Sequence, residues 1–420
     1  MTRIPRDAAP DRTLGFLADP YRFIGKRARA LDTDLFETRL LGQRTLCLTG
    51  REAGRLFYDT TRMRRAGAMP GRIVKTLLGE GGVQSLDGDL HRLRKALFLA
   101  LATGDGLARL LALVERQWAV HTRLWAAAGQ VRLYDGAIAL LSQAAFEWVG
   151  LPLDDRAVAA RTPDVAALFD GAGAVGPRHW KARLARRRLE AWLTEVSHAV
   201  RHGVWQVHPA APLARLVAHR DADGQTLSER IVAVELLNLI RPVIAVAVYI
   251  TFVAHALQRS PAARAYVRVG DATRERFAEE VRRFYPFFPA VAARTCVAFT
   301  WRDFEIPADV RVMFDLYGTN HDPRHWTSPE CFDPARFETA FDARFGFVPQ
   351  GGGDHETGHR CPGEWITVAL MTQATAWLAE RMAWSADGPP EIAMTRVPAL
   401  PEGGMTLRQV RCRHGGPAEH

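Results

Sequence analysis

The segment 345–363, FGFVPQGGGDHETGHRCPG, concentrates side chains that can bind a metal ion. It contains the HExxH pattern, His355–His359, in which a helix can place two histidines on one face to bind zinc, with the glutamate as general base. Gly351–Gly353 precede this pattern, Gly358 lies inside it and Pro362 follows it. Because glycine costs about 1 kcal/mol per helical position relative to alanine, the segment disfavours that helix. A zinc peptidase is the weakest of the candidate functions.

Cys361, in the same segment, is the stronger candidate for a metal ligand. The following residues, 364–371, predict the start of a helix, and Pro362 suits a first helical turn. A helix N-terminus favours an anionic sulfur through its unpaired N–H groups and its dipole. The alternative is that Cys361 is a small buried hydrophobic residue. The five cysteines are odd in number, scattered and without CxxC spacing, which disfavours a disulfide framework: Cys47, Cys296, Cys331, Cys361 and Cys412.

Arg241 and Pro242 interrupt the most apolar stretch of the chain, residues 231–257. About 20 apolar residues would cross a bilayer. An arginine near the bilayer centre costs about 2.5 to 3.5 kcal/mol, and Glu235 and Asn238 add further polarity. We therefore expect a buried central helix and no transmembrane segment. A buried Arg241 needs an anionic partner, which is either Glu235 or another acid, or a bound ligand.

The periodicity of apolar residues predicts a mainly α protein with small β-sheets at its ends. Helical spacing covers 109–149, 183–204, 227–257 and the shorter run 91–101, whereas alternation favours strands at 36–40, 45–49, 297–312 and 392–410. No long linker divides the chain, so we expect one domain over 1–420 with a small β-rich part at about 1–60.

The composition is that of a globular protein, with 420 residues, 48% hydrophobic and 24% charged. The net charge of +9 raises anionic partners, but no nucleic-acid-binding motif is present. We expect the basic run 181–188 to lie on a solvated helix face. The polar N-terminus lacks an apolar leader, and a cytoplasmic location is expected.

Three motifs follow one another along the chain in an order that is typical of one protein family. Glu280 and Arg283 form an ExxR pair, and Arg336 lies in the downstream segment 332–337, FDPARF. The cysteine loop and its helix follow. With this order the chain resembles the cytochrome P450 superfamily over nearly its whole length. The resemblance implies the P450 fold, a haem b between a long distal helix and the cysteine loop, Cys361 as axial iron ligand, and a structural lock of Glu280, Arg283 and Arg336.

Two departures narrow the resemblance to the fatty-acid peroxygenase branch. The central helix carries Arg241 and Pro242 where ordinary members carry an acid and an alcohol, and the loop before Cys361 is longer than usual. The resemblance implies oxidation of long-chain fatty acids by hydrogen peroxide, without an obligatory redox partner. In it the substrate carboxylate pairs with Arg241 and replaces the missing acid. Pro242 opens the helix over the iron.

The same resemblance assigns further site residues. Gln84 stands where hydroxylating relatives carry glutamine and decarboxylating relatives histidine, which favours hydroxylation, and the two residues Phe287 and Phe288 favour Cα over Cβ. The cofactor-binding candidates are Arg65, His91 and Arg294 for the haem propionates, with Gly351 and Gly363 in the cysteine loop. The remaining pocket candidates are Leu78, Phe169 and Ala172.

Two alternatives stay open. An ordinary monooxygenase with dioxygen, NAD(P)H and redox partners shares the fold and the thiolate. A non-catalytic haem protein that binds fatty acids would change its spectrum without turnover.

Overall fold

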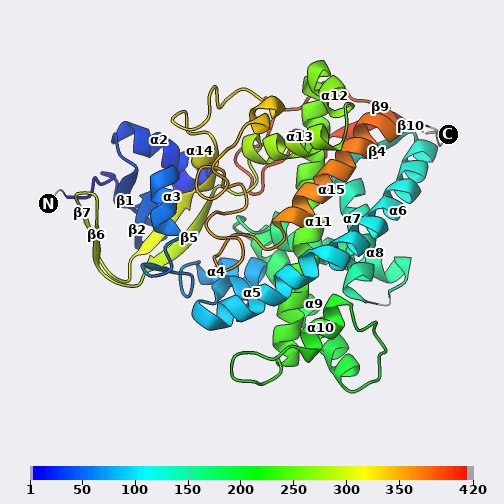
Figure 1. The fold of residues 1–420 in the computed structure, drawn as a ribbon, viewed down its shortest axis with the longest axis horizontal. Helices are drawn as coiled ribbons and strands as arrows, with labels where there is room; N and C mark the ends of the chain where they lie inside the picture. The colour runs from blue at the N-terminus through cyan, green and yellow to red at the C-terminus, as the bar shows by residue number, and fades with distance from the viewer. Residues whose placement is uncertain (1–2, 152, 414–420) are drawn as a thin grey trace.

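The computed structural model describes residues 3–151 and 153–413, in which long helices pack around one central helix and small sheets lie at the edges (Figure 1). The central helix is α11 (Glu229–Arg259). The other long helices are α5 (Gly88–Ala102), α6 (Gly104–Ala128), α7 (Leu133–Val149), α8 (Asp155–Asp170), α9 (Pro177–Arg201), α13 (Asp271–Phe284) and α15 (Glu364–Ala376).

Shorter elements connect them. They are α1 (Thr13–Ala18), α2 (Phe23–Ala30), α3 (Arg51–Phe57), α4 (Gly71–Ile73), α10 (Pro212–Ala218), α12 (Pro261–Val267), α14 (Leu316–Asn320), the π-helical turns Val74–Leu78 and Trp377–Arg381, and the 3-10 turns Val83–Ser85, Pro334–Glu338 and Glu402–Gly404.

The main sheet joins the N-terminal part of the chain to a distant segment. Its strand order is β1-β2-β8-β5-β3, formed by β1 (Leu35–Leu40), β2 (Gln43–Leu48), β8 (Arg311–Asp315), β5 (Ala290–Thr295) and β3 (Met63–Arg64). β1 and β2 form an antiparallel hairpin with Leu35 opposite Leu48, and β2 runs parallel to β8. The small sheets are β4-β10-β9, from β4 (Gln130–Arg132), β10 (Thr406–Cys412) and β9 (Met382–Ser385), and the pair β6 (Phe299–Trp301) and β7 (Phe304–Ile306).

The mainly α fold with small sheets is as predicted. The strand expected at 392–410 forms only at its end, in β10, and a second difference lies in the helical run 109–149. This run forms two helices, α6 and α7, because Gly129 adopts the left-handed conformation at φ +71° and ends α6. Strand β4 then separates the two helices and pairs with β10 near the C-terminus. The periodicity continues across the break because both helices bury a face in the same core.

Helix α11 lies in the middle of this core, against α7, α9 and α15. Its N-cap Ser228 accepts a hydrogen bond from the amide of Ile231. By length and composition α11 could cross a membrane, and 89% of its most apolar window is buried inside the protein. The pair α5 and α6 also passes this test as one bent span. The apolar surface of α11 is thus covered by the protein's own helices.

Candidate active site

Cys361 lies in a loop that ends at the first turn of α15. Its amide donates a hydrogen bond to the Gln350 carbonyl at 3.3 Å, and the Gln350 side-chain amide lies 3.9 Å from the Cys361 sulfur. Gly351 allows the turn with φ +91°, and Gly363 caps the helix. Burial, with the charge of Glu364, raises the pKa of the thiol, although the Gly363 N–H opposes this. A buried thiolate therefore needs a cationic partner, and a haem iron is such a partner.

Buried ion pairs and hydrogen bonds attach this loop to the neighbouring helices α13 and α5. The Glu364 carboxylate lies between Arg282 and Arg360, with the Arg360 Nε at 2.5 Å. Burial alone would raise the pKa of Glu364, yet these two arginines hold it at about 2. Lys95 of α5, also buried, donates to the carbonyls of Gly358 and, at 2.9 Å, Arg360. The loop is thereby fixed from both α13 and α5.

Glu280, Arg283 and Arg336 meet in one buried cluster. Arg283 donates to both carboxylate oxygens of Glu280 at 2.7 and 2.8 Å, and the Arg336 Nε lies 3.1 Å from the same carboxylate. Arg283 also donates to the carbonyls of Asn320 and Pro329 at 3.0 and 2.9 Å. The cluster connects α13 to the segment before the cysteine loop.

Arg241 is buried in α11, 6% exposed, and its Nη1 has no hydrogen-bond partner. Within 3–151 and 153–413, no acid forms an ion pair with it. Burial, with the charge of Arg186, lowers the pKa of Arg241 to about 9, and the nearby Cys361 opposes this shift. The guanidinium is therefore charged at neutral pH and forms no ion pair within the described residues.

Glu235, the acid that could have neutralised Arg241, has other partners. Its Oε1 lies 3.1 Å from Arg94 Nη1 and accepts the amide of Val83 at 2.9 Å. Its Oε2 accepts a hydrogen bond from the Asn238 side chain at 2.8 Å. A structural ion pair between Arg241 and Glu235 is therefore not formed. Arg94 was not among the predicted residues, and only its place in the helical run 91–101 hinted at burial.

Pro242 marks an opening beside Arg241. Of the described residues Val232–Leu257 it is the one that is exposed, in a helix whose other residues there are buried. An exposed apolar side chain next to an unpaired buried cation fits a ligand with a charged end and an apolar body. The charge of Cys361 also acts on Arg241, so the thiol and this charged-and-apolar pair belong to one region, and their chemistry fits a haem site that takes such a ligand.

Gln84 lies in the 3-10 turn Val83–Ser85, which the Val83 amide attaches to Glu235 of α11. The Gln84 side chain is partly buried, and its Oε1 has no hydrogen-bond partner. Gln84 thus resembles Arg241 in having a buried polar atom without a hydrogen-bond partner.

The basic run 181–188 is corrected at Arg186, which is 1% exposed rather than solvated. Arg187 and Arg188 are exposed, whereas Arg186 follows Ala182 by one helical turn on the buried face of α9. Its guanidinium donates to Glu190 at 2.6 Å and to the Leu77 carbonyl at 3.1 Å. The burial of Arg186 was not predicted from the sequence. Its position one helical turn after Ala182 was the signal that could have indicated it.

The three candidates for the haem propionates differ in their surroundings. Arg65 and His91 form no ion pair within the described residues, and burial, with the charge of His359, lowers the pKa of His91 to about 3. The Arg65 guanidinium lies over the Phe57 ring at 4.2 Å. Arg294 is already paired with Asp309, at 3.0 Å. Arg65 and the neutral His91 are thus the more available donors.

The HExxH segment forms turns rather than a helix. The His359 ring stacks on His91 with centroids 3.9 Å apart and lies 3.3 Å from Asp87, whereas the His355 ring packs near Trp365. In the described part of the chain, these two histidines do not belong to any cluster of potential metal ligands. The zinc peptidase is therefore excluded as an interpretation of this segment.

The predicted pocket residues lie in or against the main hydrophobic core. Phe169 and Ala172 are buried in it, while Leu78, Phe287 and Phe288 pack on it partly exposed. Phe287 stacks on Tyr249 of α11 with ring centroids 4.5 Å apart, and its ring lies edge-on to Phe288. Their role as walls of a substrate pocket stays a prediction.

Comparison with known proteins places the C-terminal part of the chain in a family. The family model described as Cytochrome P450 matches residues 275–405. Protopanaxadiol 6-hydroxylase of Panax ginseng is 32% identical over 115 residues, which are 27% of this chain and 24% of that protein. Melianol synthase of Citrus sinensis is 34% identical over 103 residues, or 24% of this chain and 19% of that protein. The matched segment spans about a quarter or less of these curated relatives.

Solved structures extend the similarity to the whole chain. A variant of cytochrome P450SP alpha (CYP152B1) has a TM-score of 0.94 and 44% identity, covering 96% of this chain and 100% of that one. Cytochrome P450EX alpha (CYP152N1) with myristic acid has 0.95 and 38%, covering 98% and 100%. A variant of cytochrome P450 OleT in complex with arachidonic acid has 0.95 and 32%, covering 98% and 99%. This chain belongs to the cytochrome P450 family, within its branch of fatty-acid peroxygenases.

Proposed function

We propose that the protein uses hydrogen peroxide to hydroxylate long-chain fatty acids at Cα, at Cβ, or at both, and that Arg241 binds the substrate carboxylate. The observation that carries the proposal is the buried guanidinium of Arg241, which has no counter-charge among the described residues. Two structural relatives were solved with myristic acid and arachidonic acid, which supports a fatty acid as the partner.

A carboxylate suits the Arg241 site better than a neutral ligand does. A planar guanidinium can hold two carboxylate oxygens at once and stays charged when buried. Arg186 adds a second positive charge nearby, and its own hydrogen bonds are taken by Glu190 and Leu77. Arg241 thus remains the free donor, while Arg186 strengthens the positive potential that attracts an acid.

The bound carboxylate would also serve as the acid–base group of the reaction. In the segment 239–243 of α11, LIRPV, no side chain can hold or donate a proton in this role. When bound, haem with a thiolate ligand supplies the redox chemistry of peroxide O–O cleavage. Arg241 places the carboxylate next to the exposed Pro242, where it can accept a proton from one oxygen of the peroxide and return it to the other. The dependence on a carboxylate restricts oxidation to acids.

The anchored carboxylate would set the position of hydroxylation. Because Arg241 holds the acid end, the first carbons of the chain are the ones nearest the reacting oxygen. The partly exposed rings of Phe287 and Phe288 would narrow the site and favour Cα. Gln84, with a free side-chain carbonyl, favours hydroxylation, and terminal alkene is expected as a minor product at most.

In this proposal the haem is held by a small set of residues. Cys361 would bind the iron, the turn at Gly351 and the cap at Gly363 would position its sulfur, and Arg65 and His91 would bind the propionates. No redox partner is required, because peroxide supplies both the oxygen atom and the oxidising equivalents. Because 89% of its most apolar window is buried inside the protein, α11 serves in this proposal as the core helix over the haem and not as a membrane span.

The test compares a saturated long-chain fatty acid with the alcohol of the same chain length, each with peroxide and haem-loaded protein. The acid should give 2- or 3-hydroxy acid, and the alcohol should give no product hydroxylated at the same carbons. Comparable oxidation of the alcohol would show that the carboxylate is not needed and would refute the role of Arg241.

A further inference from the structure

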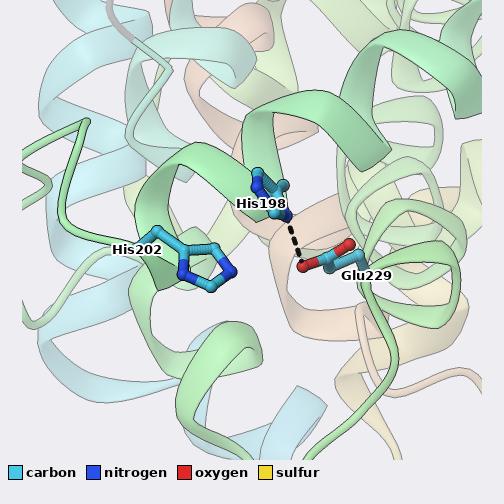
Figure 2. A group of neighbouring side chains, drawn as sticks. All are labelled: His198, His202 and Glu229. Atoms are coloured by element: carbon cyan, nitrogen blue, oxygen red, sulfur yellow. Dashed lines mark hydrogen bonds and ion pairs between the residues drawn. The ribbon is translucent and has the colours of Figure 1, made fainter.

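Three potential metal ligands gather at the junction of α9 and α11, outside the candidate active site. His198 lies in the last turn of α9, His202 follows it by four residues at the end of the helix, and Glu229 is the first residue of α11. One ligand atom from each lies within 4.8 Å of the others. Figure 2 shows His198 and Glu229 joined by a hydrogen bond, with His202 on the same side of the helix end. Residues four apart face the same way on a helix, which brings the two imidazoles together.

The contacts within this cluster leave ligand positions accessible. The His198 Nδ1 lies 2.9 Å from Glu229 Oε1, and the two imidazole centroids are 4.2 Å apart. Arg201 lies 3.8 Å from the same carboxylate oxygen, and it donates to the Leu227 carbonyl at 2.5 Å. The His198 side chain is 61% exposed, so an ion can reach it from solvent.

We propose that His198, His202 and Glu229 bind a divalent transition-metal ion, with zinc as the expected ion. Imidazole nitrogens with one carboxylate suit zinc, nickel or copper, whereas magnesium and calcium prefer all-oxygen sites. Two histidines and a glutamate, with water as fourth ligand, form a known type of zinc site. Zinc bonds of about 2.0 to 2.2 Å require the three ligand atoms, now within 4.8 Å of one another, to rearrange around the ion, which exposed side chains can do by rotation.

The ion would connect two helices that carry active-site candidates. α9 also bears Arg186, which contacts the Leu77 carbonyl, and α11 bears Arg241. The ion would close the segment 203–228 into a loop with both ends fixed. We therefore expect zinc to restrain the C-terminal end of α9 and this segment, and to leave the haem site itself unchanged.

The first experiment measures zinc binding to haem-loaded, untagged protein by isothermal titration calorimetry, with metal removed beforehand. We compare the wild type with His198→Ala, His202→Ala and the control His179→Ala, which removes a histidine from the other end of α9. Wild type and control should bind one zinc ion at this site, and each cluster variant should bind at least tenfold more weakly. An unchanged Soret spectrum verifies that each variant is folded. Equal affinity in all four proteins would overturn the proposal.

A second measurement locates the ion. Hydrogen exchange of the last turn of α9 and of 203–228 should slow on addition of zinc in the wild type and in His179→Ala. It should not change in the two cluster variants. Zinc that binds without protecting this region, or that protects the variants equally, would place the ion elsewhere and contradict the site.

Discussion

Replacing Arg241 by methionine is expected to raise the stability of the ligand-free protein and to remove its fatty-acid oxidation. The guanidinium is buried and forms no ion pair in the described part of the chain, and its pKa falls from 12.5 to about 9. At 1.36 kcal/mol per pKa unit this difference corresponds to roughly 5 kcal/mol of unfavourable burial. Because the folded-state pKa of this base is depressed, the cost is fully present below about pH 9 and is relieved only above it.

The expected changes in stability and in activity of Arg241→Met can both be estimated. Replacing a buried charge by an apolar side chain of similar volume is neutral or stabilising by about 1 to 4 kcal/mol. Losing one partner of a buried charge pair with the substrate costs about 2 to 5 kcal/mol, or roughly 30- to 5,000-fold in kcat/KM. Arg241→Met should therefore unfold at higher urea concentration and lose most of its activity.

Arg186→Met provides the matched control. Arg186 is also buried but donates to Glu190 and to the Leu77 carbonyl, so its removal leaves a buried carbonyl unpaired and breaks an ion pair. We expect this variant to be less stable than the wild type. The assays are urea unfolding of haem-loaded protein without fatty acid, and peroxide-driven turnover. If Arg241→Met lost as much stability as Arg186→Met, Arg241 would have a structural partner and the reasoning would be wrong.

Three further outcomes are expected. Glu280→Gln leaves the buried Arg283 without its carboxylate, so the free energy of unfolding, followed by Soret absorbance, should fall by about 3 to 5 kcal/mol; an unchanged midpoint would contradict the structural lock. Gln84→His should raise the fraction of terminal alkene among the products, measured by gas chromatography and mass spectrometry. An unchanged product ratio would show that residue 84 does not determine which product forms. Burial lowers the pKa of His255 to about 4, below its unfolded value of 6.5, so its contribution to stability is present above pH 6.5 and is lost as the pH falls toward 4. That contribution is roughly 3 kcal/mol at 1.36 kcal/mol per pKa unit, and His255→Asn should flatten the pH dependence of unfolding between pH 6.5 and 4, whereas an equally steep dependence would refute the assignment.

Much of the fold could be predicted because the signals were local. The apolar run 231–257 predicted the buried helix α11, and alternation at 36–40 and 45–49 predicted the strands β1 and β2. The break between α6 and α7 was missed because both helices face the same core, so the apolar periodicity does not stop at Gly129. The pairing of β2 with β8 joins strands more than 260 residues apart, and no local pattern encodes such a contact.

The candidate site also has features that the sequence predicted and features that depend on tertiary contacts. The type of residue 361 and the order of the motifs predicted a thiolate loop, and the apolar surroundings of Arg241 predicted its burial. Which acid would neutralise Arg241 depends on tertiary contacts, because Glu235 pairs with Arg94 from a different helix. Arg186 was missed for the same reason, since a basic run shows which residues are charged but not which one of them faces the core.

The most direct test of the proposed function is mass spectrometric analysis of products from haem-loaded protein, a long-chain fatty acid and hydrogen peroxide, without reductase or NAD(P)H. The account predicts 2- or 3-hydroxy acid under these conditions. If product forms only when a redox partner and NAD(P)H are added, the protein is a dioxygen-dependent monooxygenase and the peroxide-based proposal is contradicted.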